Sequence, residues 1–186
     1  RANPDAVVVV DEAYVDFGAD SAVPLLQKYE NLLVVMTYSK SRSMAGARLG
    51  FALGSRGLIE DLEKLKYSTN PYNVNRLTLK LGQAAVDSDG YFREKAREIM
   101  ATREKTAQAL RALGFTLPDS QANFLFVAHP KVAGETLYRK CKEKGVLIRH
   151  FSDPAIAAYN RVTIGTPAEM EAFLAVVQTI LKEEGA

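Results

Sequence analysis

The first third of the chain alternates apolar runs that predict buried strands with short polar connections. Val7 to Val10 is a continuous apolar run without polar alternation, which is typical of a strand buried on both faces in a parallel sheet. Leu32 to Met36 is a second such run, and Ser21 to Glu30 between them can form a short helix with Pro24 in its first turn. Strand, helix and strand over roughly 30 residues match a right-handed βαβ unit. We therefore expect the two strands to be parallel.

A third apolar run, Leu49 to Leu53, follows the second after too few residues for a parallel crossover. We therefore expect this strand to run antiparallel to its predecessor. Arg48, at its start, then lies at the same sheet edge as Lys40, after the second strand, and Asp11, after the first. Ligands of open α/β sheets bind outside the carboxyl ends of the parallel strands. The pattern thus predicts three charged residues of different kinds at one ligand-binding edge.

The rest of the chain predicts helices followed by a mixture of short elements. Helical spacing of apolar residues covers Gly57–Ser68, Val74–Val86 and a long amphipathic stretch at Tyr91–Leu113, after which Gly114 stands where a C-cap glycine belongs. Beyond it we predict strands over Phe124–Val127, Val146–Arg149 and Arg161–Ile164, and helices over Val132–Lys144 and from the capping box Thr166-Pro167-Ala168-Glu169 to about Glu183. We predict an α/β fold with a larger domain at 1–113 and a smaller α+β domain at 114–186.

Composition and charge narrow the class of protein. The 186 residues are 47% hydrophobic and 25% charged, and their formal net charge is +2 with basic and acidic residues interleaved. This distribution argues against nucleic-acid binding. Uncharged apolar stretches are too short to span a bilayer, no signal peptide is recognisable, and the single Cys141 cannot form an internal disulfide. We expect a cytoplasmic protein without a membrane partner, whose cysteine is a packed thiol.

Acidic and phenolic side chains follow the first predicted strand. Asp11, Glu12 and Asp16 are three acids within six residues, and such a cluster repels itself unless a cation lies nearby. A protonated heterocyclic nitrogen is one candidate partner for Asp11, and Tyr14 could hydrogen-bond the same ligand. The alternative is a surface carboxylate that begins a turn over a packed tyrosine.

Lys40 lies in a polar segment, 37–43, at the end of the second predicted strand. It is either a solvated surface lysine or a nucleophilic amine, and an ammonium with a reference pKa of about 10.4 must lose its proton before it attacks a carbonyl. Neighbouring positive charge from Arg42 and Arg48 favours that loss. Serine hydroxyls, including that of Ser39, together with the Arg48 guanidinium would make a phosphate cradle. This inventory of amine, carboxylate, phenol and anion site is what a pyridoxal 5′-phosphate site needs.

Several sequence motifs, taken together in their order along the chain, resemble those of one enzyme family. The chain resembles fold-type-I aminotransferases of the aspartate aminotransferase superfamily in Asp11-Glu12-Ala13-Tyr14, Ser39-Lys40-Ser41 and Ala45-Gly46-Ala47-Arg48-Leu49-Gly50. Within that superfamily it resembles histidinol-phosphate aminotransferases in Val10-Asp11-Glu12-Ala13-Tyr14-Val15-Asp16-Phe17, Asn70-Pro71-Tyr72-Asn73-Val74-Asn75, Ala122-Asn123-Phe124-Leu125-Phe126-Val127 and Arg161-Val162-Thr163-Ile164-Gly165-Thr166. The similarity covers essentially the whole chain in the right order.

The resemblance implies roles for eight residues. Lys40 would hold pyridoxal 5′-phosphate as a Schiff base and later move the substrate proton. Asp11 would pair with the pyridine nitrogen, and Tyr14 would hydrogen-bond the ring oxygen. Ser39 and Arg48, helped by Thr37, would bind the cofactor phosphate, while Arg149 and Arg161 would clamp the anionic end of the substrate. On the residues alone, the favoured interpretation of those two arginines is edge-strand charges that face water. No metal-ligand spacing is present.

The resemblance also implies a reaction and an architecture. Such enzymes transfer an amino group between glutamate and imidazoleacetol phosphate to give histidinol phosphate, work as homodimers, and combine a large domain with a mixed, mainly parallel sheet and a smaller α+β domain. The motifs match only the carboxyl-terminal part of such an enzyme, so we expect a truncated form, weak or inactive alone, that exposes apolar surface. An aromatic amino acid aminotransferase, a threonine-phosphate decarboxylase of the same superfamily and a non-catalytic structural or oligomerising fragment stay open as alternatives.

Overall fold

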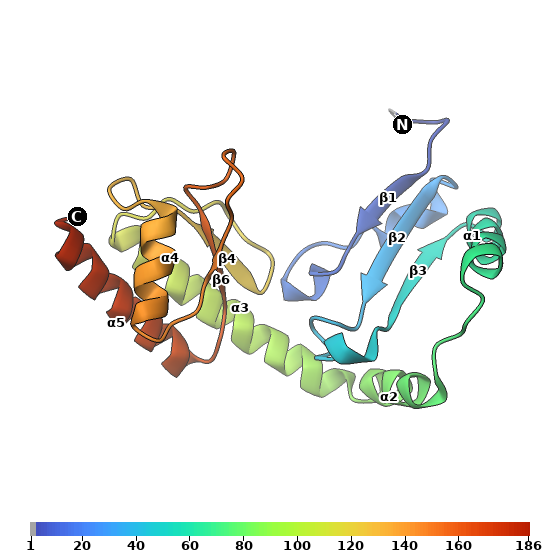
Figure 1. The fold of residues 1–186 in the computed structure, drawn as a ribbon. Coiled ribbons are helices and arrows are strands. Elements are labelled where there is room, and N and C mark those ends of the chain that lie inside the picture. Colours follow the sequence, from blue (N-terminus) through green and yellow to red (C-terminus); the bar gives the residue numbers. More distant parts are fainter. Residues whose placement is uncertain (1–2) are drawn as a thin grey trace. The chain divides into compact units, whose positions relative to one another are not determined.

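The computed structural model describes residues 3–186 and shows two compact units (Figure 1). One unit ends at Lys95 and the other begins at Ala96, so the division falls inside the long helix α3 (Asp89–Ala112). The boundary predicted at residue 113 lies at the end of the same helix. Each unit combines a three-stranded sheet with helices, which confirms the predicted α/β class.

The sheet of the first unit has the predicted topology. Its strands β1 (Val8–Asp11), β2 (Leu32–Thr37) and β3 (Gly50–Gly54) lie in the order β1-β2-β3 (Figure 1). β1 runs parallel to β2, with Asp11 opposite Val35, and β3 runs antiparallel to β2, with Thr37 opposite Gly50. The ends of β1 and β2 and the start of β3 therefore share one edge of the sheet.

The connection between β1 and β2 is tighter than the predicted helix over Ser21–Glu30. It contains two 3₁₀ helices, η1 (Val15–Phe17) and η2 (Val23–Gln27), with Pro24 in the first turn of η2. The buried Glu12 side chain accepts hydrogen bonds from Ser21 Oγ at 2.8 Å and from the Ala22 amide. The Glu12 carboxylate thus binds the residues just before η2, and the segment between β1 and β2 forms a short 3₁₀ turn instead of the longer predicted helix.

The prediction that β1 is buried on both faces is wrong for this chain. Val9 of β1 is 57% exposed and Val7, just before the strand, is 53% exposed, because the elements that pack on this sheet contact mainly β2 and β3. η2 packs on β2 and β3, and α1 (Arg56–Thr69) packs on β3. The apolar side chains of β1 thus stay accessible, in agreement with the apolar exposure expected from the resemblance.

Two further helices lead out of the first unit. Helix α2 (Arg76–Asp87) begins at Asn75, whose side chain accepts a hydrogen bond from the Thr78 amide at 2.9 Å. Helix α3 ends where Gly114 adopts a φ of 87°, a left-handed conformation that favours glycine. Both helices confirm the elements predicted from apolar spacing.

The second unit holds the larger hydrophobic core. Its strands β4 (Phe124–Val127), β5 (Arg149–His150) and β6 (Asn160–Thr163) form an antiparallel sheet in the order β4-β6-β5, and α4 (Gly134–Glu143) and α5 (Pro167–Glu184) complete the unit (Figure 1). Buried apolar side chains of α3, the sheet and the two helices meet in one cluster that includes Leu110, Leu125, Leu137, Val177 and Ile180.

Two details of the second unit refine the predicted elements. β5 is only two residues long, because the Val146 amide donates to the Cys141 carbonyl at 2.8 Å and so closes the end of α4 instead of entering the sheet. The capping box of α5 is present, with the Thr166 side chain and the Glu169 side chain each accepting from the other residue's amide. Within residues 3–186, no helix combines the length and apolar character needed to cross a bilayer.

Candidate active site

The turn after β1 orients the first group of predicted site residues. One carboxylate oxygen of Asp11 accepts a hydrogen bond from the Ala13 amide at 2.9 Å, which fixes the side chain over its own turn. Of the neighbouring acids, Glu12 points inward to the start of η2, and Asp16 accepts a hydrogen bond from the Ser41 hydroxyl. The expected repulsion among three acids is therefore relieved by partners within the protein, and Asp11 is the acid left at the sheet edge.

Lys40 and Tyr14 come together from two different loops. The Lys40 Nζ atom lies 5.4 Å from the centroid of the Tyr14 ring, within the range of a cation–π contact. The hydrogen bond between Ser41 and Asp16 ties the same two loops to each other. Because the Lys40 side chain is exposed, its amine is accessible at the edge where Asp11 also lies.

The predicted phosphate-binding residues lie around the end of β2. The Thr37 and Ser39 hydroxyl oxygens are 3.0 Å apart, and the Ser39 amide donates to Thr37 Oγ1 at 3.1 Å. Arg48 follows the 3₁₀ helix η3 (Ala45–Ala47), has a left-handed φ of 55°, and donates to the Ala45 carbonyl at 3.0 Å. A hydrogen bond from the Tyr38 amide to the Leu49 carbonyl, 3.0 Å long, places Arg48 beside this strand end.

A small-residue face on α2, which the sequence reasoning missed, carries the loop between Lys40 and Arg48. Thr78, Gly82 and Ala85 are buried, and their spacing of four and three residues puts them on one side of the helix. A Cβ atom at Gly82 would lie 2.5 Å from Leu49 Cδ2, so glycine allows the close approach. The sequence signal that could have predicted this face is the helical spacing of small residues within the predicted helix 74–86.

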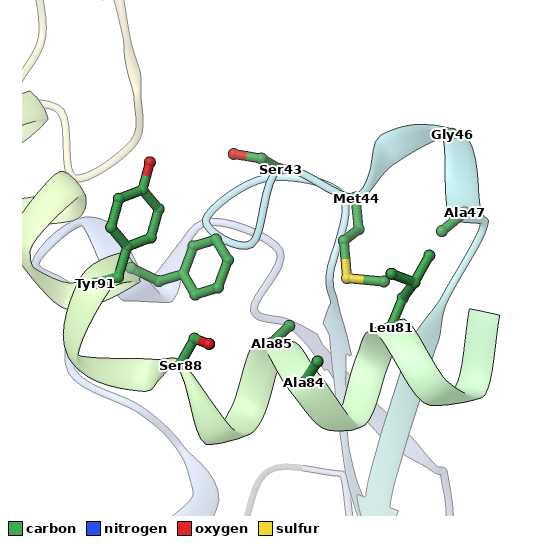
Figure 2. Close-up of a pocket in the computed structure, with 10 residues that line it drawn as sticks. Ser43, Met44, Gly46, Ala47, Leu81, Ala84, Ala85, Ser88 and Tyr91 are labelled. Carbon is green, nitrogen blue, oxygen red and sulfur yellow. The ribbon is translucent and has the colours of Figure 1, made fainter. Parts of the chain in front are cut away.

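Beside this contact the loop and helices α2 and α3 line an open, mainly apolar pocket of about 590 Å³ (Figure 2). In Figure 2 the Met44 side chain extends from the loop toward Leu81, and Ala84, Ala85 and Ser88 lie along the helix below. The pocket lies behind the loop that carries the predicted site residues. Its lining is mainly apolar and small.

The two predicted substrate arginines pair with each other in the second unit. Arg149 on β5 is the direct register partner of Arg161 on β6. The Arg149 guanidinium carbon lies 5.6 Å from the Phe151 ring centroid, and that of Arg161 lies 5.5 Å from the Phe124 ring centroid. Like charges directly opposite on neighbouring strands destabilise a sheet, and an anion bound between them removes that cost. The arrangement suits a dianion.

The residue pair behind the arginines fixes their register. His150 Nδ1 and Asn160 Oδ1 are 3.2 Å apart, and Asn160 Nδ2 donates to the Gly134 carbonyl at 2.9 Å. Asn160 is fully buried. The structure thus groups six predicted residues at one sheet edge of the first unit and pairs the other two in the second. Among residues 3–186, no group of three or more His, Cys, Asp or Glu side chains could hold a metal ion.

Comparison with known proteins identifies the family. Residues 1–177 match the profile described as aminotransferase class I and II. The histidinol-phosphate aminotransferase of Brachyspira hyodysenteriae is 48% identical over 181 residues, which are 97% of this chain and 51% of that protein.

Solved structures agree with this family. A putative histidinol-phosphate aminotransferase from Erwinia carotovora atroseptica superposes with a TM-score of 0.83 at 26% identity, covering 94% of this chain and 51% of the other. The Sinorhizobium meliloti histidinol-phosphate aminotransferase, solved in complex with pyridoxal 5′-phosphate, superposes with a TM-score of 0.79 at 23% identity. The superposition covers 95% of this chain and 49% of the other. The chain thus spans about half the length of the curated relatives it matches. Over that half, it belongs to the aminotransferase class I and II family.

Proposed function

We propose that this chain forms the lysine-bearing and substrate-clamping part of a pyridoxal 5′-phosphate-dependent aminotransferase. The observation that carries the proposal is the meeting of the Lys40 amine with the Tyr14 ring at the sheet edge where Asp11 and the Thr37–Ser39 hydroxyl pair lie. This donor set fits the cofactor, because it offers an amine for the aldehyde, a carboxylate for the pyridine nitrogen, a phenol for the ring oxygen and neutral donors for the phosphate.

Each residue has a separate task in that proposal. When bound, pyridoxal 5′-phosphate supplies an electron-withdrawing ring that makes the α-proton of an amino acid removable. The Asp11 carboxylate, held by the Ala13 amide, keeps a proton on the pyridine nitrogen by charge pairing. Thr37, Ser39 and Arg48 would bind the phosphate, and the Lys40 amine would be the base that moves the α-proton of the substrate in the 1,3-shift.

The substrate inferred for the site is a primary amine, or the corresponding ketone, that carries a phosphate where an amino acid carries a carboxylate. The Arg149–Arg161 pair presents two guanidinium groups from adjacent strands, and two such groups suit a dianionic phosphate better than a single carboxylate. Together with the names of the relatives, this favours histidinol phosphate and imidazoleacetol phosphate, with glutamate as amino donor. We further infer that the complete enzyme is a cytoplasmic homodimer, as the composition and the resemblance suggest.

Cofactor binding is tested by spectroscopy on the chain itself. After pyridoxal 5′-phosphate is added and the unbound cofactor is removed, the visible band of an aldimine is expected in the wild type and not in Lys40→Ala. Lys64→Ala is the matched control, because Lys64 is an exposed lysine of the same unit that pairs with Asp61. A band that survives in Lys40→Ala contradicts the assignment of Lys40. Absence of a band in every variant favours a non-catalytic structural fragment.

Substrate choice is tested after the chain is completed with the amino-terminal half of a histidinol-phosphate aminotransferase. Steady-state rates are compared for histidinol phosphate, phenylalanine and threonine phosphate as amino donors. We expect kcat/KM to be highest for histidinol phosphate. Preference for phenylalanine identifies an aromatic aminotransferase instead, and release of carbon dioxide from threonine phosphate identifies a decarboxylase.

A further inference from the structure

The loop that follows Lys40 is held in a conformation that its own sequence does not favour. Ser43 has a φ of 56°, in the left-handed region that non-glycine residues seldom adopt. The Ser43 amide donates to the Lys40 carbonyl at 3.1 Å, and the Met44 amide donates to the Tyr38 carbonyl at 3.0 Å, so Lys40 begins a closed turn. Backbone in such a conformation persists when contacts around it hold it in place. The residues that hold this turn therefore determine where the Lys40 amine lies.

Arg42, within this turn, has three contacts with the ends of two helices. Its guanidinium donates to Asp89 Oδ1 at 2.6 Å and to the Ala85 carbonyl at 3.4 Å, and its Cζ lies 5.3 Å from the Phe92 ring centroid. Asp89 is the first residue of α3, and it also accepts from Arg93 one turn later. Arg42 thus connects the turn to the junction of α2 and α3.

Burial distinguishes Arg42 from Arg93, the other partner of Asp89. The Arg42 side chain is 20% exposed, whereas that of Arg93 is 73% exposed. The hydrogen bond from Arg42 is the largest cause of a lowered pKa at Asp89, with that from Arg93 second. Asp89 therefore stays ionised at neutral pH, and the contact with Arg42 joins two opposite charges in a partly desolvated place.

Consecutive residues after Lys40 are anchored on two separate elements. Ser41 donates to Asp16, in η1, and Arg42 donates to Asp89, at the start of α3. We propose that Arg42 is a positioning residue, which through Asp89 and the Ala85 carbonyl holds the Lys40 turn so that the Lys40 amine stays over the Tyr14 ring. This inference rests on the proposed function for the role of Lys40, but the anchoring itself does not depend on it.

Amide hydrogen exchange of the full chain tests the anchoring without cofactor. In Arg42→Met and in Asp89→Asn, the Ser43 and Met44 amides are expected to exchange at least ten times faster than in the wild type. Arg42→Lys keeps the charge and should restore part of the protection. Arg93→Met is the matched control, because it removes the exposed partner of Asp89 and should leave both amides unchanged. Unchanged exchange of the Leu33 and Val34 amides in β2 shows that the sheet is intact.

A second measurement connects the anchoring to the amine. Lys40 is labelled with pyridoxal 5′-phosphate and sodium borohydride, and the labelled peptide is quantified by mass spectrometry over a range of pH. The labelling rate of Lys40 should fall about fivefold in Arg42→Met and Asp89→Asn, with a shifted pH profile, and should stay at the wild-type value in Arg93→Met. If wild-type Lys40 does not react, the proposed function fails while hydrogen exchange still decides the anchoring. Wild-type exchange at Ser43 and Met44 in both variants overturns the proposal, as does unchanged labelling of Lys40.

Discussion

Arg149 and Arg161 lie directly opposite each other on β5 and β6. β5 contains only two residues, so backbone pairing alone specifies this register weakly. The neighbouring pair in the same register is His150 and Asn160, whose side chains meet at 3.2 Å. A slip by one residue would carry Arg149 to the other face of the sheet and separate the two guanidinium groups. The polar pair therefore preserves the arrangement of the charged pair.

Removal of either arginine should weaken binding of a phosphorylated substrate. In the chain completed with an amino-terminal half, Arg149→Met and Arg161→Met are each expected to raise KM for histidinol phosphate by about tenfold or more, because each loses a charge-assisted hydrogen bond. Steady-state kinetics measures the change. Arg139→Met, which removes an exposed pair with Glu143 on α4, is the control. An unchanged KM in both variants would mean that the two arginines do not clamp the substrate.

Loss of the buried asparagine should destabilise the second unit. Asn160→Ala leaves the Gly134 carbonyl without its side-chain donor and removes the partner of His150, and we expect a cost of about 1–3 kcal/mol in the free energy of unfolding. Urea denaturation measures this change. The control is Asn123→Ala, at a partly exposed residue just before β4, whose cost should be smaller. Equal losses in the two variants would argue against a special role for Asn160.

Local patterns predicted most of the sheet edge where the candidate site lies. Apolar runs and connection lengths placed Asp11, Lys40 and Arg48 together, because strand direction follows from the length of the crossover. They did not predict that the Glu12 side chain turns inward. An acid at the end of a strand can face solvent or accept hydrogen bonds from a later segment, and here that segment begins nine residues further along the chain, at Ser21. The exposure of Val7 and Val9 likewise depends on which elements cover β1.

The role of Arg42 was hidden for a related reason. The sequence shows Arg42 only as positive charge two residues after Lys40, whereas its partner Asp89 is 47 residues further along the chain. No local period connects the two residues. The pairing becomes visible only when the start of α3 is placed beside the Lys40 turn, which requires the packing of α2 under the loop.

Filling the close contact at Gly82 should disturb that packing. A Cβ atom there would lie 2.5 Å from Leu49 Cδ2, so Gly82→Val forces Leu49 or the helix to move, and we expect a loss of about 1–3 kcal/mol in the free energy of unfolding. Thermal or urea denaturation of the chain measures the loss. Gly57→Val tests the specificity of the effect, because a Cβ atom at Gly57 meets no atom within 4 Å. Similar stability of the Gly82 variant and wild type would show that the loop does not rest closely on α2.

The buried cysteine gives the second unit a dependence on alkaline pH. Cys141 is fully buried in the core, and burial raises the pKa of its thiol from an ordinary value of 9.0 to about 11. Burial disfavours the thiolate in the folded chain, whereas the unfolded chain ionises freely. Because the pKa of the thiol is higher in the folded chain than in the unfolded chain, the neutral thiol contributes to stability. This contribution is fully present below the unfolded pKa and is lost as the pH rises through the folded pKa. The loss therefore falls between about pH 9 and pH 11.

Comparison of the wild type with Cys141→Ala isolates this effect from other groups that titrate in the same range. We expect the difference in unfolding free energy between the two proteins to shrink by about 2–3 kcal/mol from pH 8 to pH 11, because two pKa units correspond to that energy. Urea denaturation at a series of pH values measures it. For the same reason the thiol should react with maleimide at pH 8 only after denaturant is added. Rapid labelling of the native chain, or a pH-independent difference, would show that Cys141 is not enclosed in the core.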